Sequence, residues 1–391
     1  MARQPNPFHP GFNLPPAVLA GRARVIEDFV EALDIAALDH RTPRTMILVG
    51  PRGVGKTVTL GELAEVAGKR LSWPTVHVEA KPSTFLRDLV TRMAEVTELL
   101  ELEAAPRPDR RRRQPRIAGG KISAAGFGVG AELHLVNAGD IPPSPIEQLD
   151  EVFARAAEAA IERDAGIVLT LDELQTAKPE DVATLAAVLQ EHVPHDWPLV
   201  VVIAALPSLR TTRGPKALPT YLERAQWHDL GPLDEAATHT ALTEPASMAG
   251  RPMTPESAAA LTALSGGYPY AIQVCGHFAW RASTGSDTIT AEHAELARPR
   301  IEADLDQLFR SRWEDASPNE REYLIAMARA AADRAPTSRA VADELATTTP
   351  RVAYLRDRLL KKGTIYATGD GTMHFITPGM GEWLLRHQDS G

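Results

Sequence analysis

Cysteine is nearly absent from this chain of 391 residues: Cys275 is the single one, so no internal disulfide can form. The longest apolar run, Leu199 to Leu206, is far too short to span a bilayer. Neither sign of charge dominates, because 42 Lys and Arg stand against 51 Asp and Glu. The resulting net charge of -9 argues against a protein coated with nucleic-acid contacts, although it leaves room for a local basic face.

Several chemistries lack their usual sequence signals. The twelve histidines show no paired spacing with cysteine or carboxylate that would hold a metal, and no G-x-S-x-G element occurs. The N-terminal segment MARQPNPFHPGFNLPP has no apolar core of signal-peptide length. We therefore expect a cytoplasmic globular protein with no membrane partner, and its length indicates two or three domains.

The stretch MILVGPRGVGKTVTL, Met46 to Leu60, combines an apolar run, a glycine-rich turn and a Lys-Thr pair. It fits G-x-x-x-x-G-K-[ST], in which glycines let backbone N–H groups point at a phosphate at the positive end of the following helix. Lys56 is expected to reach the β- and γ-phosphates, and the Thr57 hydroxyl to take one Mg²⁺ position. We predict a P-loop that binds ATP or ADP with Mg²⁺ through Gly50, Pro51, Arg52, Gly53, Val54, Gly55, Lys56, Thr57 and Val58.

A second apolar run, AGIVLTLDELQ from Ala165 to Gln175, ends in two carboxylates. Such a run is typical of a buried parallel strand, and its C-terminal end is where α/β folds bind ligands. Asp172 is the candidate for holding the metal, and Glu173 for orienting and polarising the attacking water. The plain alternative is a strand followed by an acidic helix start, but the P-loop favours the catalytic interpretation because it needs such a carboxylate.

With these two motifs the chain resembles the AAA+ ATPases, in particular the branch of the origin-recognition and cell-division-cycle initiators, and is also similar to the signalling STAND NTPases. GPRGVGKT and IVLTLDE stand in the Walker A and Walker B places. The resemblance implies an α/β P-loop core with a five-stranded parallel sheet, an all-α lid, and ATP hydrolysis. It also gives Arg22, in LPPAVLAGRARVIEDFVEAL, a contact to the adenine; a loop before an ordinary amphipathic helix is the alternative.

The same resemblance divides the chain. The core strands are expected near residues 45–50, 75–79, 166–171, 199–204 and 227–230. Lid helices should start at Asp234, Thr254 and Pro269, and Pro299 should bend or break the helix that follows. The expected units are a nucleotide-binding core over 1–231 with an insertion at about 101–145, a helical lid over 232–300, and a linker helix with a winged-helix domain over 301–391.

Two features of the resembled families are missing. The fourth strand ends in Ala204-Ala205, where a polar residue usually senses the γ-phosphate, and the lid helix beginning near Pro269 has no basic residue at its start. Gly267-Tyr268-Pro269 instead resembles the G-x-P element of signalling NTPases, which would bring Pro269 near the nucleotide. The alternative is an ordinary helix start, where glycine often precedes proline. Slow hydrolysis and a switch, in place of a continuous motor, are the expectation.

Arg224, in YLERAQWHDL, stands where the initiator branch places an arginine finger that acts on a neighbouring subunit's ATP. That role would make the ATPase a nucleotide-dependent homo-oligomer with Arg224 as a catalytic residue. An exposed arginine on a helix is more often solvated surface, so both interpretations stay open.

An arginine-rich segment interrupts the core. Residues 107 to 116, RPDRRRRQPR, hold six arginines and one acid. They could contact phosphates or an acidic protein surface, or form a solvated loop. The alternation of Val129, Ala131, Leu133 and Leu135 after it favours a strand of a glycine-rich hairpin.

The sequence pattern of the C-terminal segment from Ser317 predicts a winged helix-turn-helix. Ser317 should cap a first helix, Gly363 should end a third, and the two short runs around Gly-Asp-Gly should form a wing hairpin. The third helix carries a surplus of basic residues that could dock in the major groove of double-stranded DNA. The DNA-contact candidates are Arg351, Arg356, Arg358, Lys361 and Lys362.

Two functions follow from these patterns. The first is an ATP-dependent switch that couples its nucleotide state to DNA binding or assembly through the winged helix. The alternative is a STAND-like signalling ATPase whose tail binds a protein partner, because winged helices serve both purposes.

Overall fold

The computed structural model describes residues 5–11, 14–102, 144–211, 218–331, 336–368, 371–377 and 379–387. The arginine run at 107–116 and the alternating segment after it lie outside these residues. No helix in the described ranges is long and apolar enough to cross a membrane.

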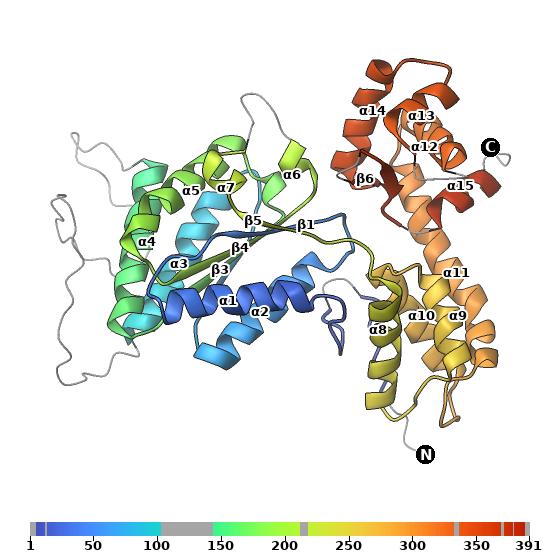
Figure 1. The fold of residues 1–391 in the computed structure, drawn as a ribbon, viewed down its shortest axis with the longest axis horizontal. Helices are drawn as coiled ribbons and strands as arrows, with labels where there is room; N and C mark the ends of the chain where they lie inside the picture. Colours follow the sequence, from blue (N-terminus) through green and yellow to red (C-terminus); the bar gives the residue numbers. More distant parts are fainter. Residues whose placement is uncertain are drawn as a thin grey trace.

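A parallel sheet of five strands forms the core, in the order β2-β3-β4-β1-β5 (Figure 1). Its strands β1 and β4 are buried along their whole length, which explains their continuous apolar sequences. The five strands confirm the sequence prediction to within two residues at each end. They are β1 (Met46–Val49), β2 (Thr75–Glu79), β3 (Ile167–Asp172), β4 (Leu199–Ala205) and β5 (Gln226–Asp229).

Helices cover both faces of this sheet. On one face, Met46 and Leu48 share a buried cluster with residues of α1 and α2. On the other, Ile47 and Val49 pack in the cluster that holds α3, α4, α5 and α7. The alternation follows from the two-residue period of a strand. The helices are α1 (Ala23–Ala37), α2 (Lys56–Leu71), α3 (Phe85–Leu102), α4 (Pro145–Glu162), α5 (Pro179–His192), α6 (Ser208–Thr211) and α7 (Thr220–Glu223), with short 3-10 turns η1 (Leu174–Thr176) and η2 (Val193–His195).

After the sheet the described chain is almost entirely helical, as expected. Asp234 and Thr254 cap the first two helices with their side chains, and Pro269 begins the third, as the sequence predicts. Of the expected bend or break at Pro299, the break is absent: α11 continues through the proline, with Ala297 and Ile301 buried on either side of it. These helices are α8 (Glu235–Met248), α9 (Pro255–Ser265), α10 (Pro269–Ala282) and α11 (Ala291–Glu314).

The long helix α11 leads to the C-terminal part of the chain (Figure 1). Ser317 forms a capping box with Glu320, and Gly363 ends α14 with a positive φ of 64°, both as predicted. Two strands pair antiparallel after that glycine. The C-terminal elements are α12 (Pro318–Ala330), α13 (Ser338–Glu344), α14 (Thr349–Lys362), β6 (Ile365–Ala367), β7 (Met373–Phe375) and α15 (Met380–His387).

One apolar cluster runs from α8 through α11 to α15. It also includes Phe8, which reaches α10 from near the start of the chain and lies against Gly276. Asn6 donates a hydrogen bond to the His277 carbonyl, at 3.2 Å. The free thiol of Cys275 is buried here, as expected, and burial raises its pKa to about 12.

Candidate nucleotide-binding site

The loop between β1 and α2 has the backbone shape of a phosphate-binding turn. Gly53 and Gly55 have φ of 78° and 90°, a region that residues with a Cβ rarely adopt. Gly50 is required for a different reason, since a Cβ there would lie 2.2 Å from the Leu230 carbonyl at the end of β5. The loop therefore depends on all three glycines and leads directly into the N-terminus of α2.

Lys56, the first residue of α2, is buried and folds back over this loop. Its Nζ donates to the Gly50 carbonyl at 2.9 Å and to the Pro51 carbonyl at 2.8 Å. Burial lowers the pKa of Lys56, while the charges of Glu173 and Asp172 act in the opposite direction. The ammonium is thus held at the turn, where phosphate oxygens would be stronger partners than neutral carbonyls.

Thr57 and Asp172 meet where the sequence predicts a metal site. The Thr57 hydroxyl donates to Oδ2 of Asp172 at 2.5 Å, while Oδ1 of Asp172 accepts from the Glu173 N–H at 2.8 Å. A hydroxyl and a carboxylate are hard oxygen ligands of the kind that Mg²⁺ takes from a protein when phosphates supply others. The donor set therefore fits Mg²⁺, with Thr57 and Asp172 as the residues that would hold it.

Glu173 follows β3 in the left-handed region, with φ of 52°. Its Oε2 accepts a hydrogen bond from Nε2 of Gln175 at 2.6 Å. Oε1 of the same glutamine accepts from the Leu206 N–H at 2.9 Å, just after β4. Sequence reasoning missed Gln175; its only signal was its place two residues after Glu173, on a short turn.

Arg22 is also at this site, although it lies before the sheet. Its guanidinium donates to the Val54 carbonyl in the loop at 2.9 Å and to the Gly231 carbonyl at 3.2 Å. Burial lowers the pKa of Arg22. The residue joins the P-loop to the segment that leads into α8.

The lid and the C-terminal part both touch the loop at Arg52. The hydroxyl of Tyr268, which precedes Pro269 at the start of α10, donates to the Arg52 carbonyl at 3.4 Å. A Cβ on Gly363, at the end of α14, would lie 3.3 Å from the side-chain carbons of Arg52. The G-x-P resemblance implied that Pro269 lies near the nucleotide, but sequence reasoning did not predict that Tyr268 or Gly363 would meet Arg52, because each pair is more than two hundred residues apart in the chain.

Arg224 ends α7 on the exposed surface. Its carbonyl accepts two hydrogen bonds from Arg44, at 3.1 and 2.6 Å. Within the described part of the chain, its guanidinium has no hydrogen bond or ion pair.

Comparison with known proteins agrees with this geometry. Residues 18–202 match the model of the family described as the AAA ATPase domain. The enzyme is an ATPase. Residues 306–384 match a second family, described only as a domain of unknown function, DUF8462. No curated protein matches the chain.

Solved structures resemble the whole chain at low sequence identity. The Walker-type ATPase PABY2304 of Pyrococcus abyssi is 17% identical with a TM-score of 0.55, over 94% of this chain and 96% of that one. Cdc6p of Pyrobaculum aerophilum is 14% identical (TM-score 0.49, 97% of each chain). Orc1 of Aeropyrum pernix, solved in complex with DNA, is 15% identical (TM-score 0.45, 96% and 94%). The likeness to the Pyrococcus abyssi ATPase shows the shared fold.

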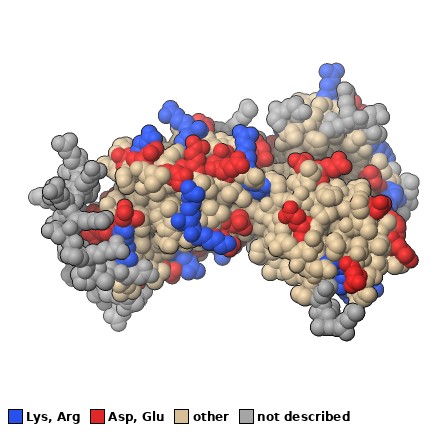
Figure 2. Space-filling view, turned by 60° about the horizontal axis from the view of Figure 1, so that its bottom comes forward, with Lys and Arg blue, Asp and Glu red and all other residues tan. Residues whose placement is uncertain are grey.

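The charges of this ATPase are mixed on the face shown in Figure 2. Blue and red side chains alternate over the core, and the right-hand half, which holds the lid and the C-terminal part in Figure 1, carries scattered acids and few basic residues there. No broad basic surface is visible from this side.

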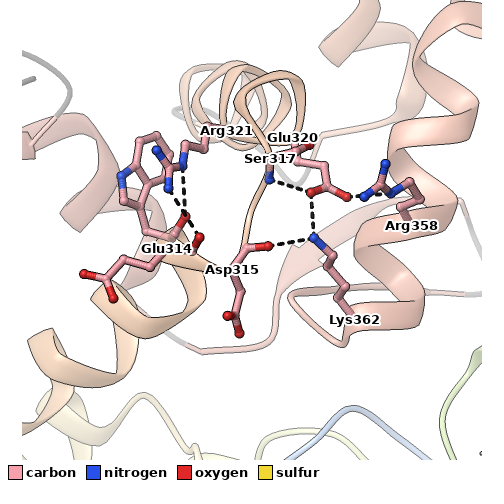
Figure 3. Close-up of polar contacts among 8 residues, drawn as sticks. Glu314, Asp315, Ser317, Glu320, Arg321, Arg358 and Lys362 are labelled. Carbon is pink, nitrogen blue, oxygen red and sulfur yellow. Dashed lines mark hydrogen bonds and ion pairs between the residues drawn. The ribbon is translucent and has the colours of Figure 1, made fainter.

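Most of the predicted DNA-contact cations on α14 already have partners. Arg358 and Lys362 both pair with Glu320 of α12, at 2.9 and 2.7 Å, and this carboxylate has no exposed surface (Figure 3). Arg356 pairs with Asp357 at 3.0 Å and donates to the Ser338 hydroxyl at 3.1 Å. Arg351 and Lys361 have no such partner in the described part of the chain. Glu320 therefore adds one negative charge beside α14, which lowers the local surplus from four to three, and its two ion pairs hold Arg358 and Lys362 against α12.

The close approach of Gly53 to the lid gives a testable result. A Cβ at Gly53 would lie 2.0 Å from the Tyr268 hydroxyl, in a backbone region with positive φ. Gly53→Ala should therefore lower the free energy of unfolding by about 1–3 kcal/mol. Denaturant titration measures this, with Gly61→Ala in α2 as control, because a Cβ there meets nothing within 4 Å. Equal stability of the two variants would contradict the contact with Tyr268.

Proposed function

We propose that this ATPase is a cytoplasmic switch in which the nucleotide at the P-loop controls the contact between the core and the C-terminal part. The observation that carries the proposal is the position of Arg52. The carbonyl of this P-loop residue accepts a hydrogen bond from Tyr268 of the lid, and its side-chain carbons lie 3.3 Å from the position that a Cβ on Gly363 would take. A loop that changes shape on binding a triphosphate will disturb both contacts.

Charge at the same place supports the proposal. Arg312 near the end of α11 lies close enough to Tyr268 and Arg52 to interact electrostatically with both. Burial lowers the pKa of Arg312 and Arg52 acts in the same direction, while Tyr268 and the carboxylate of Asp315 oppose them. Two cations therefore gather where the C-terminal part meets the P-loop, and an incoming polyanion would change the balance between them.

Hydrolysis uses the residues of the two Walker motifs. Lys56 stabilises negative charge on the phosphates, and Glu173 orients and polarises the attacking water. Mg²⁺, held by Thr57 and Asp172, would neutralise charge on the phosphate oxygens. Pro269 would lie near the nucleotide, because its neighbour Tyr268 meets the P-loop at Arg52, and Arg22 would contact the adenine. Turnover is slow, because β4 ends in the apolar pair Ala204-Ala205.

The nucleotide state of the switch is proposed to control the assembly of copies of this chain into homo-oligomers. Arg224 acts as a finger on the ATP of a second copy, so turnover per subunit depends on nucleotide-dependent homo-oligomers. An exposed guanidinium that has no hydrogen bond or ion pair among the described residues supports this role.

The C-terminal part is proposed to be a winged helix, with β6 and β7 as its wing. Its exposed α14 surface carries Arg351, Tyr354, Asp357 and Lys361, a mixture of both charges and an aromatic ring. Such a mixture is typical of a protein interface, where aromatic residues and arginine are enriched. We therefore propose a protein partner for this surface and keep double-stranded DNA as the second candidate, since Arg351 and Lys361 remain unpaired among the described residues.

The separation of the two parts can be measured by energy transfer between dyes. Because Cys275 is buried and its pKa is raised to about 12, it does not compete for thiol labels. A pair at Glu158→Cys and Glu344→Cys joins the core to the C-terminal part. We expect transfer to differ between ADP and a non-hydrolysable ATP analogue, and a pair within the core, Glu31→Cys and Glu158→Cys, to stay constant.

Identical transfer with both nucleotides, at concentrations where calorimetry detects binding, would contradict the switch. Sizing chromatography of the same samples, with and without duplex DNA at low salt, distinguishes the two candidate partners of the α14 surface, DNA and protein. Binding to DNA that weakens steeply with salt and with Arg351→Glu would favour DNA over a protein partner.

A further inference from the structure

We propose that Gln175 is a positioning residue that holds the Glu173 carboxylate in the orientation needed to polarise water. The inference rests on the role proposed above for Glu173. Its basis is a bridge of two hydrogen bonds, from Nε2 of Gln175 to Glu173 at 2.6 Å and from the Leu206 N–H to Oε1 of Gln175 at 2.9 Å.

The chemistry of the two partners fixes which end of the amide faces which. The Leu206 N–H can only donate, so the amide oxygen must face β4. The amide nitrogen must then face Glu173, whose ionised carboxylate can only accept. A flip of the amide group, which would exchange its oxygen and nitrogen, would break both hydrogen bonds. The orientation of the Gln175 amide is therefore determined.

The bridge restrains a side chain that would otherwise rotate. Glu173 has three side-chain torsions, while its main chain is fixed by the left-handed φ of 52° and by the hydrogen bond from its N–H to Asp172. One carboxylate oxygen is occupied by the Gln175 amide, which leaves the other for water. A base that is already held in one orientation loses less conformational entropy when it reaches the reactive geometry.

The bridge also connects the carboxylate to the P-loop. Leu206 follows Ala205, whose carbonyl accepts a hydrogen bond from the Gly50 N–H at 3.2 Å. The last residues of β4, Ala204 and Ala205, are buried and offer no polar side chain. Gln175, in the turn η1 that follows β3, thus places a polar group beside the end of β4.

Two substitutions of Gln175 test the inference by separating the hydrogen bond from the space that the side chain fills. Gln175→Glu keeps the size and an acceptor for Leu206 but removes the donor to Glu173. Gln175→Ala removes both. We expect kcat for ATP hydrolysis to fall by about tenfold or more in each, with the glutamate variant at least as impaired, because like charges then face each other.

Binding should be spared, which separates positioning from a general structural defect. The KM for ATP and the calorimetric affinity for ADP should stay near wild-type values in both variants, and so should the thermal midpoint of Gln175→Glu, which keeps the acceptor for the Leu206 N–H. Gln190→Ala on α5, an exposed glutamine, is the matched control and should leave kcat unchanged. A Gln175→Glu variant that hydrolyses ATP like the wild type, or a loss that appears in KM alone, would overturn the inference.

A double-variant cycle distinguishes failure of the inference from failure of the role of Glu173. If Gln175 acts through Glu173, then Gln175→Ala should lower kcat by less than about twofold in a Glu173→Ala background. An equal further loss in that background overturns the inference alone. Wild-type turnover by Glu173→Ala itself would overturn the proposed role of Glu173 and the inference with it.

Discussion

Lys56→Met is expected to lower kcat for ATP hydrolysis by about 10²–10³-fold and to weaken the binding of ATP. Methionine keeps a similar length and removes the charge, so the variant isolates the ammonium. That group now donates to the Gly50 and Pro51 carbonyls, which places it over the turn. Removing one such donor from a site that stabilises developing negative charge typically costs this much. Phosphate release at saturating ATP measures the effect.

A matched control distinguishes the site from a general loss of positive charge. Lys81 is exposed and follows β2, so Lys81→Met should leave turnover and affinity unchanged. Calorimetry with ADP and with an ATP analogue should show the larger loss for the analogue, since Lys56 is expected to reach the γ-phosphate. Wild-type turnover by Lys56→Met would exclude the P-loop as the catalytic site.

The parts of the site that the sequence predicted are those whose signals are local. GPRGVGKT fixes a turn within eight residues, and the buried run before Asp172 fixes a parallel strand, so β1, β3 and the contact between Thr57 and Asp172 could be expected. Each of these depends on glycine φ angles or on strand burial, which short patterns encode. The five-stranded core followed from the family resemblance.

The missed contacts involve partners far apart in the chain. Gln175 meets Leu206 only because β3 and β4 lie side by side in the sheet. Tyr268 and Gly363 reach Arg52 only because the lid and the C-terminal part pack against the core. No local pattern encodes contacts between such distant segments. Counting the charges of α14 could not reveal that two of its cations form ion pairs with Glu320 on a different helix.

Glu320→Gln is expected to lower the free energy of unfolding of the C-terminal part by about 2–3 kcal/mol. The carboxylate is fully buried and accepts from the Ser317 N–H and from Lys362, both at 2.7 Å, while Arg358 pairs with its other oxygen (Figure 3). Breaking a buried ion pair leaves the remaining charges uncompensated, at a cost of about 3–5 kcal/mol. The lower figure applies here because Arg358 and Lys362 are each a third or more exposed.

The pH dependence of this difference gives a second measurement on the same variant. Burial raises the pKa of Glu320, but its hydrogen bonds from Lys362 and Ser317 outweigh burial and hold the pKa below the ordinary 4.5. A depressed carboxyl pKa stabilises the fold above about pH 4.5, and that stability is lost as pH falls through the folded-state pKa. Wild type and Glu320→Gln should therefore converge in denaturant titrations as the pH falls from 6 to 3.

The control for both measurements is Glu322→Gln on the same helix, whose exposed carboxylate should contribute little at any pH. The Glu320 variant also bears on the function of α14, because it releases Arg358 and Lys362 from their shared partner. If duplex DNA were the target of this helix, freeing two cations should raise its low-salt affinity for DNA even as the domain becomes less stable. A variant as stable as Glu322→Gln would contradict the buried network, and the pairing of α14 would then give no reason to prefer a protein partner.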